Sequence, residues 1–177
     1  MKYVLLLRGI NVGGKNKVSM AELKDKISNV GYKNVISYIN SGNIIFDTTD
    51  GIDTVNQSIS KILNTYPFKI NKVILSRSEY LEELENLPSW WFNDSYRKDV
   101  LFYTNEIDYS LMRAHIEQMP LQDEAVHFGK YAVFWGKYNE TSYLKTSYHK
   151  YLIKESFYKS ITIRNSRTFE KIADLLK

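Results

Sequence analysis

The order of strand-like and helix-like segments constrains this 177-residue chain most, because the same order occurs twice. In the first half, β-rich runs and amphipathic helical patterns follow one another as strand, helix, strand, strand, helix, strand and helix. The second half repeats this order after a join. Strand–helix–strand–strand–helix–strand is the order of a ferredoxin-like module, a four-stranded antiparallel sheet with both helices on one face. The sequence therefore predicts an α+β protein with two ferredoxin-like modules.

The first module is expected over residues 1–88. Ser19 and Glu22 form a capping box, which predicts the start of its first helix. Pro88 ends its last helix, because proline cannot continue one. Strands are predicted over 3–8, 34–39, 43–46 and 69–75, and helices over 20–30, 53–66 and 77–87.

The second module is expected over residues 89–177. The helical spacing of Leu144, Tyr148, Tyr151 and Leu152 predicts a core stripe on one of its helices. The endings SRSEYLEEL and SRTFEKIADL are alike in the two halves, which supports a duplication. Strands are predicted over 99–103, 124–128, 131–135 and 160–164, and helices over 110–119 and within 142–155. A last helix is expected to be capped by Ser166 or Asn165 and to run to Leu176.

Composition excludes several kinds of site. The chain contains no cysteine, which excludes disulfides, cysteine nucleophiles and thiolate metal ligands. No apolar run approaches the roughly 18 residues of a membrane span, and no signal-peptide cleavage site follows the N-terminus. We therefore expect a cytoplasmic protein without a membrane segment.

Charge is unevenly distributed along the chain, whose net charge is +4. Residues 128–177 carry ten Lys and Arg against four Asp and Glu, whereas residues 1–127 carry 14 against 16. A basic, tyrosine-rich third suits an anionic partner such as RNA or a phosphorylated ligand. A solvated lysine face explains the same composition, because such faces are common on soluble proteins.

A glycine-rich loop follows the first strand and reads GINVGGKN over residues 9–16. It differs by one residue from the P-loop pattern, G-x-x-x-x-G-K-[ST], which binds nucleotide phosphates. Asn16 stands where that pattern needs a hydroxyl for magnesium, and the next helix begins only after Ser19. The sequence therefore argues against a P-loop hydrolase.

We expect this loop to meet the turn of the hairpin that follows. In a ferredoxin-like sheet the first and third strands are antiparallel neighbours, so Arg8 should lie beside the start of the third strand. The N-terminus of the first helix, with its unpaired N–H groups, should lie at the same corner. Backbone amides and basic side chains there are suited to an anion. The predicted ligand-binding residues are Arg8, Gly9, Asn11, Gly13, Gly14, Lys15, Ser41, Gly42 and Asn43.

A structural interpretation of the same corner stays open. Its glycines permit positive φ in a long connection, and Asn11 and Asn43 can satisfy backbone groups of the loops. No metal and no cofactor is expected, since the three histidines lack metal-ligand spacing and cysteine is absent. No G-x-S-x-G elbow points to a serine nucleophile either.

Three blocks of the sequence resemble a bacterial family known as domain of unknown function 1697: LLRGINVGGKNKVSMAELK, YINSGNIIF and TIRNSRTFEKIADL. The resemblance runs along the whole chain, and its RGINVGG and SGN blocks are the specific ones. It implies a two-module α+β plait and no activity. The polar positions that it marks are Arg8, Asn11, Ser41, Asn43, Arg164, Asn165 and Thr168, of which the last three form a possible secondary site.

The leading hypothesis from the sequence is a binding protein whose N-terminal corner holds a small phosphate-bearing anion. One alternative is a metal-independent enzyme acting on such a ligand, with Arg8 and Lys15 stabilising charge and His149 carrying a proton. The other alternative is a nucleic-acid or protein interaction module that uses the basic C-terminal third.

Overall fold

The computed structural model describes residues 1–104 and 106–177. These residues form two compact units, the first made of residues 1–81 and 172–177 and the second of residues 82–171. Each unit holds one four-stranded antiparallel sheet with helices. The prediction of an α+β protein with two ferredoxin-like modules is therefore confirmed.

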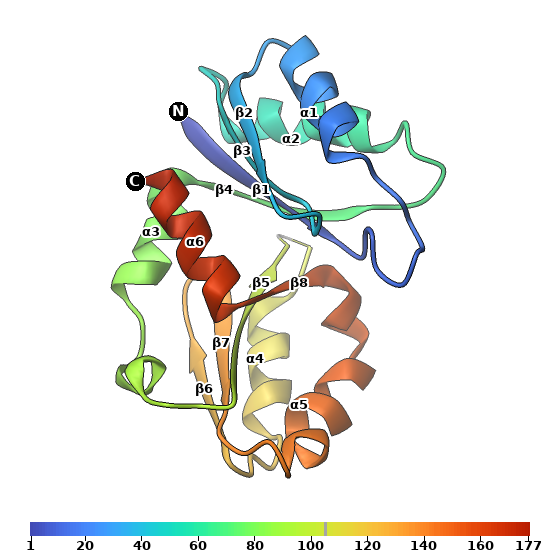
Figure 1. Ribbon diagram of the computed structural model, residues 1–177. Coiled ribbons are helices and arrows are strands. Elements are labelled where there is room, and N and C mark those ends of the chain that lie inside the picture. The colour runs from blue at the N-terminus through green and yellow to red at the C-terminus, as the bar shows by residue number, and fades with distance from the viewer. Residues whose placement is uncertain (105) are drawn as a thin grey trace. The chain divides into compact units, whose positions relative to one another are not determined.

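The sheet of the first unit has the strand order β2-β3-β1-β4, with β1 in antiparallel contact with both β3 and β4. This order confirms the expected pairing of the first and third strands. Figure 1 shows α1 and α2 together beside this sheet. The elements are β1 Lys2–Arg8, α1 Met20–Asn29, β2 Lys33–Tyr38, β3 Asn43–Asp47, α2 Ile52–Leu63 and β4 Asn71–Ser76.

Strand β1 is buried on both faces, so its sequence reads as a continuous apolar run. Tyr3, Leu5 and Leu7 alternate onto the core shared with the apolar residues of α1 and α2. Their neighbours Val4 and Leu6 are fully buried as well. A strand with two covered faces has no solvent side, and this holds β1 and the start of its following loop in place.

Two helices are divided between the units. Helix α3, Arg77–Glu85, begins in the first unit, and helix α6, Ser166–Leu176, ends in it. Within the first unit, Arg77 Nε donates to the Leu176 carbonyl at 2.6 Å. This bond satisfies a carbonyl that the end of a helix leaves unpaired.

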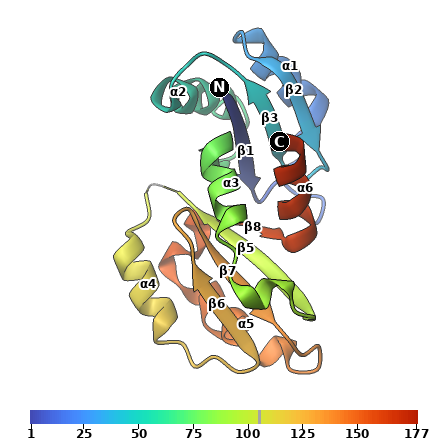
Figure 2. The same cartoon turned by 90° about the vertical axis from the view of Figure 1, so that its left-hand side faces the viewer.

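The sheet of the second unit repeats the order of the first, as β6-β7-β5-β8. Figure 2 shows β5, β6 and β7 running side by side. The elements are η1 Ser89–Phe92, β5 Arg97–Tyr103, α4 Tyr109–Glu117, β6 Glu124–Phe128, β7 Ala132–Lys137, η2 Tyr143–Lys145, α5 Ser147–Lys150, η3 Leu152–Lys154, η4 Ser156–Ser160 and β8 Ile161–Asn165.

Both faces of the second sheet are also covered. On one face Leu101, Val133 and Trp135 pack with the apolar residues of α4 and α5. On the other, the Trp91 ring meets the edges of two phenylalanines, with centroids 5.4 Å from Phe134 and 6.0 Å from Phe169. The six residues of β7 are therefore all buried.

The helix expected within residues 142–155 is present only as α5, which is four residues long. The chain forms three short turns there, η2, α5 and η3, of three or four residues each. Thr146 separates the first two with an extended backbone (φ −63°, ψ 154°), and Tyr151 lies between the second and third. An extended residue cannot continue the i→i+4 hydrogen bonding of a helix.

This break changes which side chains reach the core. Tyr148 and Leu152 are buried, as the predicted stripe requires, but Leu144 is 74% exposed and Tyr151 is 44% exposed. The stripe prediction is therefore right for two residues and wrong for the other two.

Among residues 1–104 and 106–177, no helix has the length and apolar character needed to cross a bilayer.

Candidate functional site

The glycine-rich loop after β1 folds into a small hairpin of its own. Val12 and Lys15 form an isolated bridge, with the Lys15 N–H donating to the Val12 carbonyl at 3.0 Å. Gly13 and Gly14 form the tip with φ of 57° and 74°. Two positive φ angles in a two-residue turn are what a type I′ hairpin needs, and glycine adopts them without steric cost.

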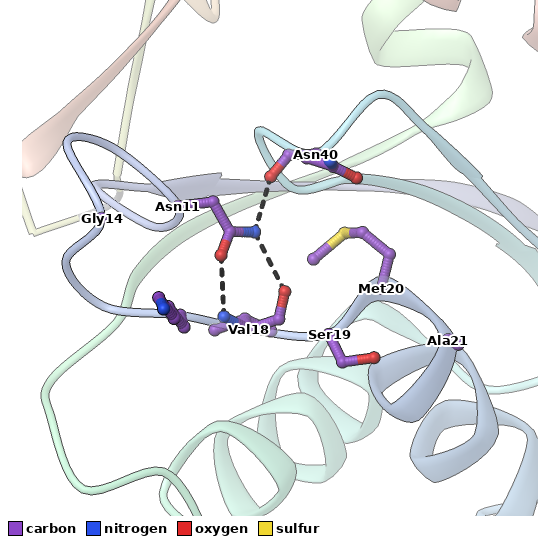
Figure 3. Close-up of a pocket in the computed structure, with 8 residues that line it drawn as sticks. Asn11, Gly14, Val18, Ser19, Met20, Ala21 and Asn40 are labelled. Carbon is purple, nitrogen blue, oxygen red and sulfur yellow. Dashed lines mark hydrogen bonds between the residues drawn. The ribbon is translucent and has the colours of Figure 1, made fainter.

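Asn11 holds this hairpin against the rest of the corner. Its Nδ2 donates to the Val18 carbonyl at 2.9 Å and to the Asn40 carbonyl at 2.8 Å, and its Oδ1 accepts from the Val18 N–H at 2.8 Å (Figure 3). Asn16 closes the base of the loop by donating to the Gly9 carbonyl at 3.0 Å. The side chain of Asn11 therefore fixes the loop beside the β2–β3 turn, as the sequence led us to expect.

The β2–β3 turn is held by a second asparagine. Buried Asn43 donates through Nδ2 to the Tyr38 carbonyl and to Ser41 Oγ, both at 3.0 Å. Gly42, with φ of 81°, accepts from the Leu7 N–H at 2.8 Å. A Cβ at Gly42 would come within 2.6 Å of the Leu7 Cβ, so this position requires glycine. These residues connect the turn to the end of β1.

An open hollow of about 670 Å³ lies between this loop and the N-terminus of α1 (Figure 3). Among the residues predicted from the sequence, Asn11 and Gly14 line it. The other predicted residues of this corner belong to the same strand end, loop and turn without lining the hollow. The lining residues are Asn11, Gly14, Lys17, Val18, Ser19, Met20, Ala21 and Asn40.

The start of α1 forms one wall of the hollow. Ser19 is its N-cap and accepts from the Glu22 N–H at 3.3 Å. Met20 and Ala21 contribute the first two N–H groups of the helix, which have no carbonyl partner within it. The positive end of the helix dipole and exposed Lys17 therefore border the same space. Such a wall can accept a negatively charged group.

At the possible secondary site, the side chain of Arg164 is buried. Arg164 Nη1 donates to Thr162 Oγ1 and to the Ile163 carbonyl, both at 2.9 Å. Asn165 Oδ1 accepts from the Thr168 N–H at 2.9 Å, which caps the start of α6. Within the second unit these groups therefore have structural partners.

The second unit also contains a charged cluster that the sequence analysis did not select. Asp99 and Lys137 form a fully buried ion pair between neighbouring strands β5 and β7. Arg97, half exposed, adds a 3.0 Å contact from Nε to the same carboxylate. Burial outweighs the attraction of Asp99 and lowers the pKa of Lys137 to about 8.

An alternation pattern could have revealed this pair. Asp99 precedes Leu101 by two residues and Lys137 follows Trp135 by two, so both charges lie on the apolar face of the sheet. A charged residue in phase with core residues indicates a buried ion pair.

Among the described residues, no group of three His, Cys, Asp or Glu side chains could hold a metal ion.

These features define a protein of two α+β units with a glycine-rich loop at the end of its first strand. The family described as "Protein of unknown function (DUF1697)" matches residues 1–134, and the chain belongs to it. The family inferred from the sequence blocks is therefore confirmed.

A solved structure shows the same fold over nearly the whole chain. The conserved bacterial protein SP0830 from Streptococcus pneumoniae is similar with a TM-score of 0.94 and 50% sequence identity. The similarity covers 99% of this chain and 98% of that chain. A search of curated proteins gave no match.

Proposed function

We propose that this protein binds a small phosphate-bearing ligand in the hollow at the N-terminus of α1. The observation that carries this proposal is the wall in which Lys17, Gly14 and the first turn of α1 border one open space. A phosphate group there accepts hydrogen bonds from the Met20 and Ala21 amides and pairs with the Lys17 ammonium.

The loop hairpin gives this ligand its second wall. Gly14 has no side chain, so the ligand can approach the backbone of the hairpin tip closely. Lys15 is exposed on the same hairpin and adds positive potential near the hollow. Asn11 acts through the loop, because both polar ends of its side chain are used to hold Val18 and Asn40.

A thermal-shift series tests the proposal, because a ligand that binds only the folded state raises the melting temperature. The probes are inorganic phosphate, ribose 5-phosphate, AMP and GMP, each compared with sodium chloride or sodium sulfate of the same ionic strength. We expect at least one organic phosphate to stabilise the protein more than the salts do, and Lys17→Glu to remove that difference.

The matched control is Lys61→Glu, because Lys61 is an exposed lysine on α2 of the same unit. This variant changes the net charge equally and should keep the full ligand-dependent shift. The absence of a shift with every phosphate compound, or equal losses in the two variants, would contradict the proposed site.

A further inference from the structure

A short segment covers the buried Asp99–Lys137 pair of the second unit. It reaches the pair and the neighbouring Arg97 through tyrosine rings and a hydrogen bond. This segment, which we name the strap, comprises residues 143–150, formed by η2 and α5. Tyr143 Oη accepts from Arg97 Nη1 at 3.0 Å. Further along the strap, Ser147 Oγ donates to the Pro120 carbonyl at 2.6 Å.

The Glu124 carboxylate anchors the middle of the strap. It accepts from the Ser147 N–H at 2.9 Å and from the Tyr148 N–H at 3.1 Å. It also accepts from Trp135 Nε1 at 2.9 Å. A carboxylate that binds the first amides of α5 holds this short helix in place, as an N-cap does.

The strap covers the ammonium of Lys137 with an aromatic ring. The Lys137 Nζ lies 3.3 Å from the centroid of the buried Tyr148 ring and 5.4 Å from that of Tyr143. The Tyr148 ring in turn meets the edge of Trp135, with centroids 5.5 Å apart. Lys137 has no exposed side-chain surface, so removing the strap would return its ammonium to water.

Several charged groups face this ammonium from the surrounding elements. Strand β5 contributes Arg97 and Asp99, and β6 contributes Glu124. The strap contributes His149, whose Nε2 is buried and forms no hydrogen bond with the described residues. Further titratable neighbours among the described residues include Tyr96, Tyr143, Tyr148 and, from η4, Tyr158.

We propose that the strap opens and closes over the Asp99–Lys137 pair, and that opening is coupled to proton uptake by the buried cluster. The strap is built from two turns of three or four residues, each too short to be stable alone. Its closed position therefore depends on its contacts with the rest of the unit, and three of these contacts are made with the charged residues Glu124, Arg97 and Lys137. A change in the charge of the cluster acts directly on these contacts.

The direction of the coupling follows from the pKa of Lys137. Closure buries the amine and lowers its pKa from 10.5 to about 8, so the closed form binds the proton more weakly than an open form in which the amine is in water. Proton binding then favours opening. The equilibrium should shift toward the closed strap as pH rises from about 8 toward 10.5. Below pH 8 the open strap should be more populated than it is at higher pH.

His149 acts in the same direction at lower pH. Burial and the positive charges of Lys137 and Arg97 lower the pKa of its imidazole below the ordinary value. Closure therefore favours neutral His149, and acid below the ordinary histidine range promotes opening further. Two groups on different elements thus connect protonation to the same movement.

Hydrogen exchange of the full-length protein, corrected for the intrinsic effect of pH, measures the movement. The reporters are the amides of Ser147 and Tyr148, which donate to Glu124. The ordinary pKa of 10.5 in the open form and the lowered pKa of about 8 in the closed form predict an increase in protection of about tenfold between pH 6.5 and 9. The amide of Leu101 in the centre of β5 should not follow this change.

The double variant Lys137→Met with Asp99→Asn removes both buried charges at nearly constant size, so the protein should still fold and strap protection should become independent of pH above 6.5. Lys130→Met is the control, because exposed Lys130 also lies over a tyrosine ring, 5.1 Å from the centroid of Tyr131.

An equal change of protection with pH at Leu101 would indicate global unfolding and contradict the proposed opening of the strap. Protection that is flat or falls with pH in the wild type would overturn it as well.

Discussion

Each unit places a lysine over a tyrosine ring, but the lysine is partly exposed in the first unit and fully buried in the second. In the first unit Lys26 Nζ lies 4.3 Å from the centroid of Tyr66 and 2.8 Å from a Glu22 carboxylate oxygen, with the lysine side chain 31% exposed. The hydrogen bond with Glu22 raises the pKa of Lys26. This lysine stays in contact with water, so the hydrogen bond with Glu22 outweighs the effect of burial and favours the charged form.

In the second unit the same pair of groups is buried. Lys137 lies 3.3 Å from the centroid of Tyr148 and pairs with Asp99, and neither charged side chain is exposed. Burial lowers the pKa of Lys137 to about 8 in spite of the Asp99 carboxylate. Similar contacts thus have opposite effects on proton affinity, because loss of hydration decides the outcome in the core.

The two sheets differ at corresponding places on their helix-side faces. Where β1 pairs Tyr3 with Phe46, the rings stack with centroids 6.0 Å apart. Where β5 pairs Asp99 with Trp135, a charge takes the place of the first ring. The second unit therefore contains a charged group at a position that the first fills with apolar surface.

Replacing Asp99 by Ala should have the largest effect in this comparison. It removes the ion-pair partner of the buried Lys137 ammonium, and removing one partner of a buried pair costs about 3–5 kcal/mol. Urea unfolding followed by tryptophan fluorescence measures the change, since all three tryptophans lie in the second unit.

The matched change in the first unit is Glu22→Ala, which removes the carboxylate beside Lys26. We expect no measurable change in the unfolding midpoint, followed by far-UV circular dichroism. Equal destabilisation by the two variants would show that burial does not distinguish the pairs.

Replacing Tyr148 by Leu should have the next largest effect. It removes the ring over Lys137 and the edge contact with Trp135, which together suggest a loss of about 2–3 kcal/mol. Tyr66→Leu at the partly exposed pair should cost clearly less. The same urea titrations measure both, and a larger loss for Tyr66→Leu would reverse the comparison.

The helix caps should behave alike in the two units. Ser19 accepts from the Glu22 N–H of α1, and Asp108 accepts from the Leu111 N–H of α4. Each cap is exposed, so Ser19→Ala and Asp108→Ala should each cost about 1 kcal/mol. A large difference between them would mean that the units differ in more than their buried charges.

Salt should have the smallest effect and should separate the two lysines. Raising sodium chloride from 50 to 500 mM screens the exposed Lys26–Glu22 pair and should lower the raised pKa of Lys26 toward its ordinary value. The pKa of Lys137 should stay near 8, because ions do not reach it. Nitrogen NMR of the lysine ammonium groups measures both, and a shift confined to Lys137 would refute its burial.

Sequence patterns predicted the strands and helices well where apolar residues repeat with a clear period. The order of strands and helices, read as a ferredoxin-like module, predicted that the first and third strands are neighbours, and therefore where the glycine-rich loop would lie. The interrupted helix near Thr146 was not predicted, because the period of Leu144 and Tyr148 fits a helix whether or not one residue between them is extended.

The candidate site was predicted only in outline. Glycines and asparagines indicated loops with special backbone angles, and Asn11 and Gly14 do line the hollow. The pattern did not say which backbone groups Asn11 would satisfy, because that depends on how close the Asn40 carbonyl comes in space. Asp99 was missed because a single acidic residue beside a join indicates no particular chemistry, although its phase with Leu101 indicated the core.

The division of α6 between the units has a consequence for how the protein is made. Ile172, Ala173 and Leu176 are fully buried and belong to the first unit, together with residues 1–81. Translation proceeds at about 5–20 residues per second from the N-terminus, so residues 82–171 leave the ribosome before these three do. Residues 1–81 must therefore stay without these three core side chains until the whole of the second unit has been synthesised.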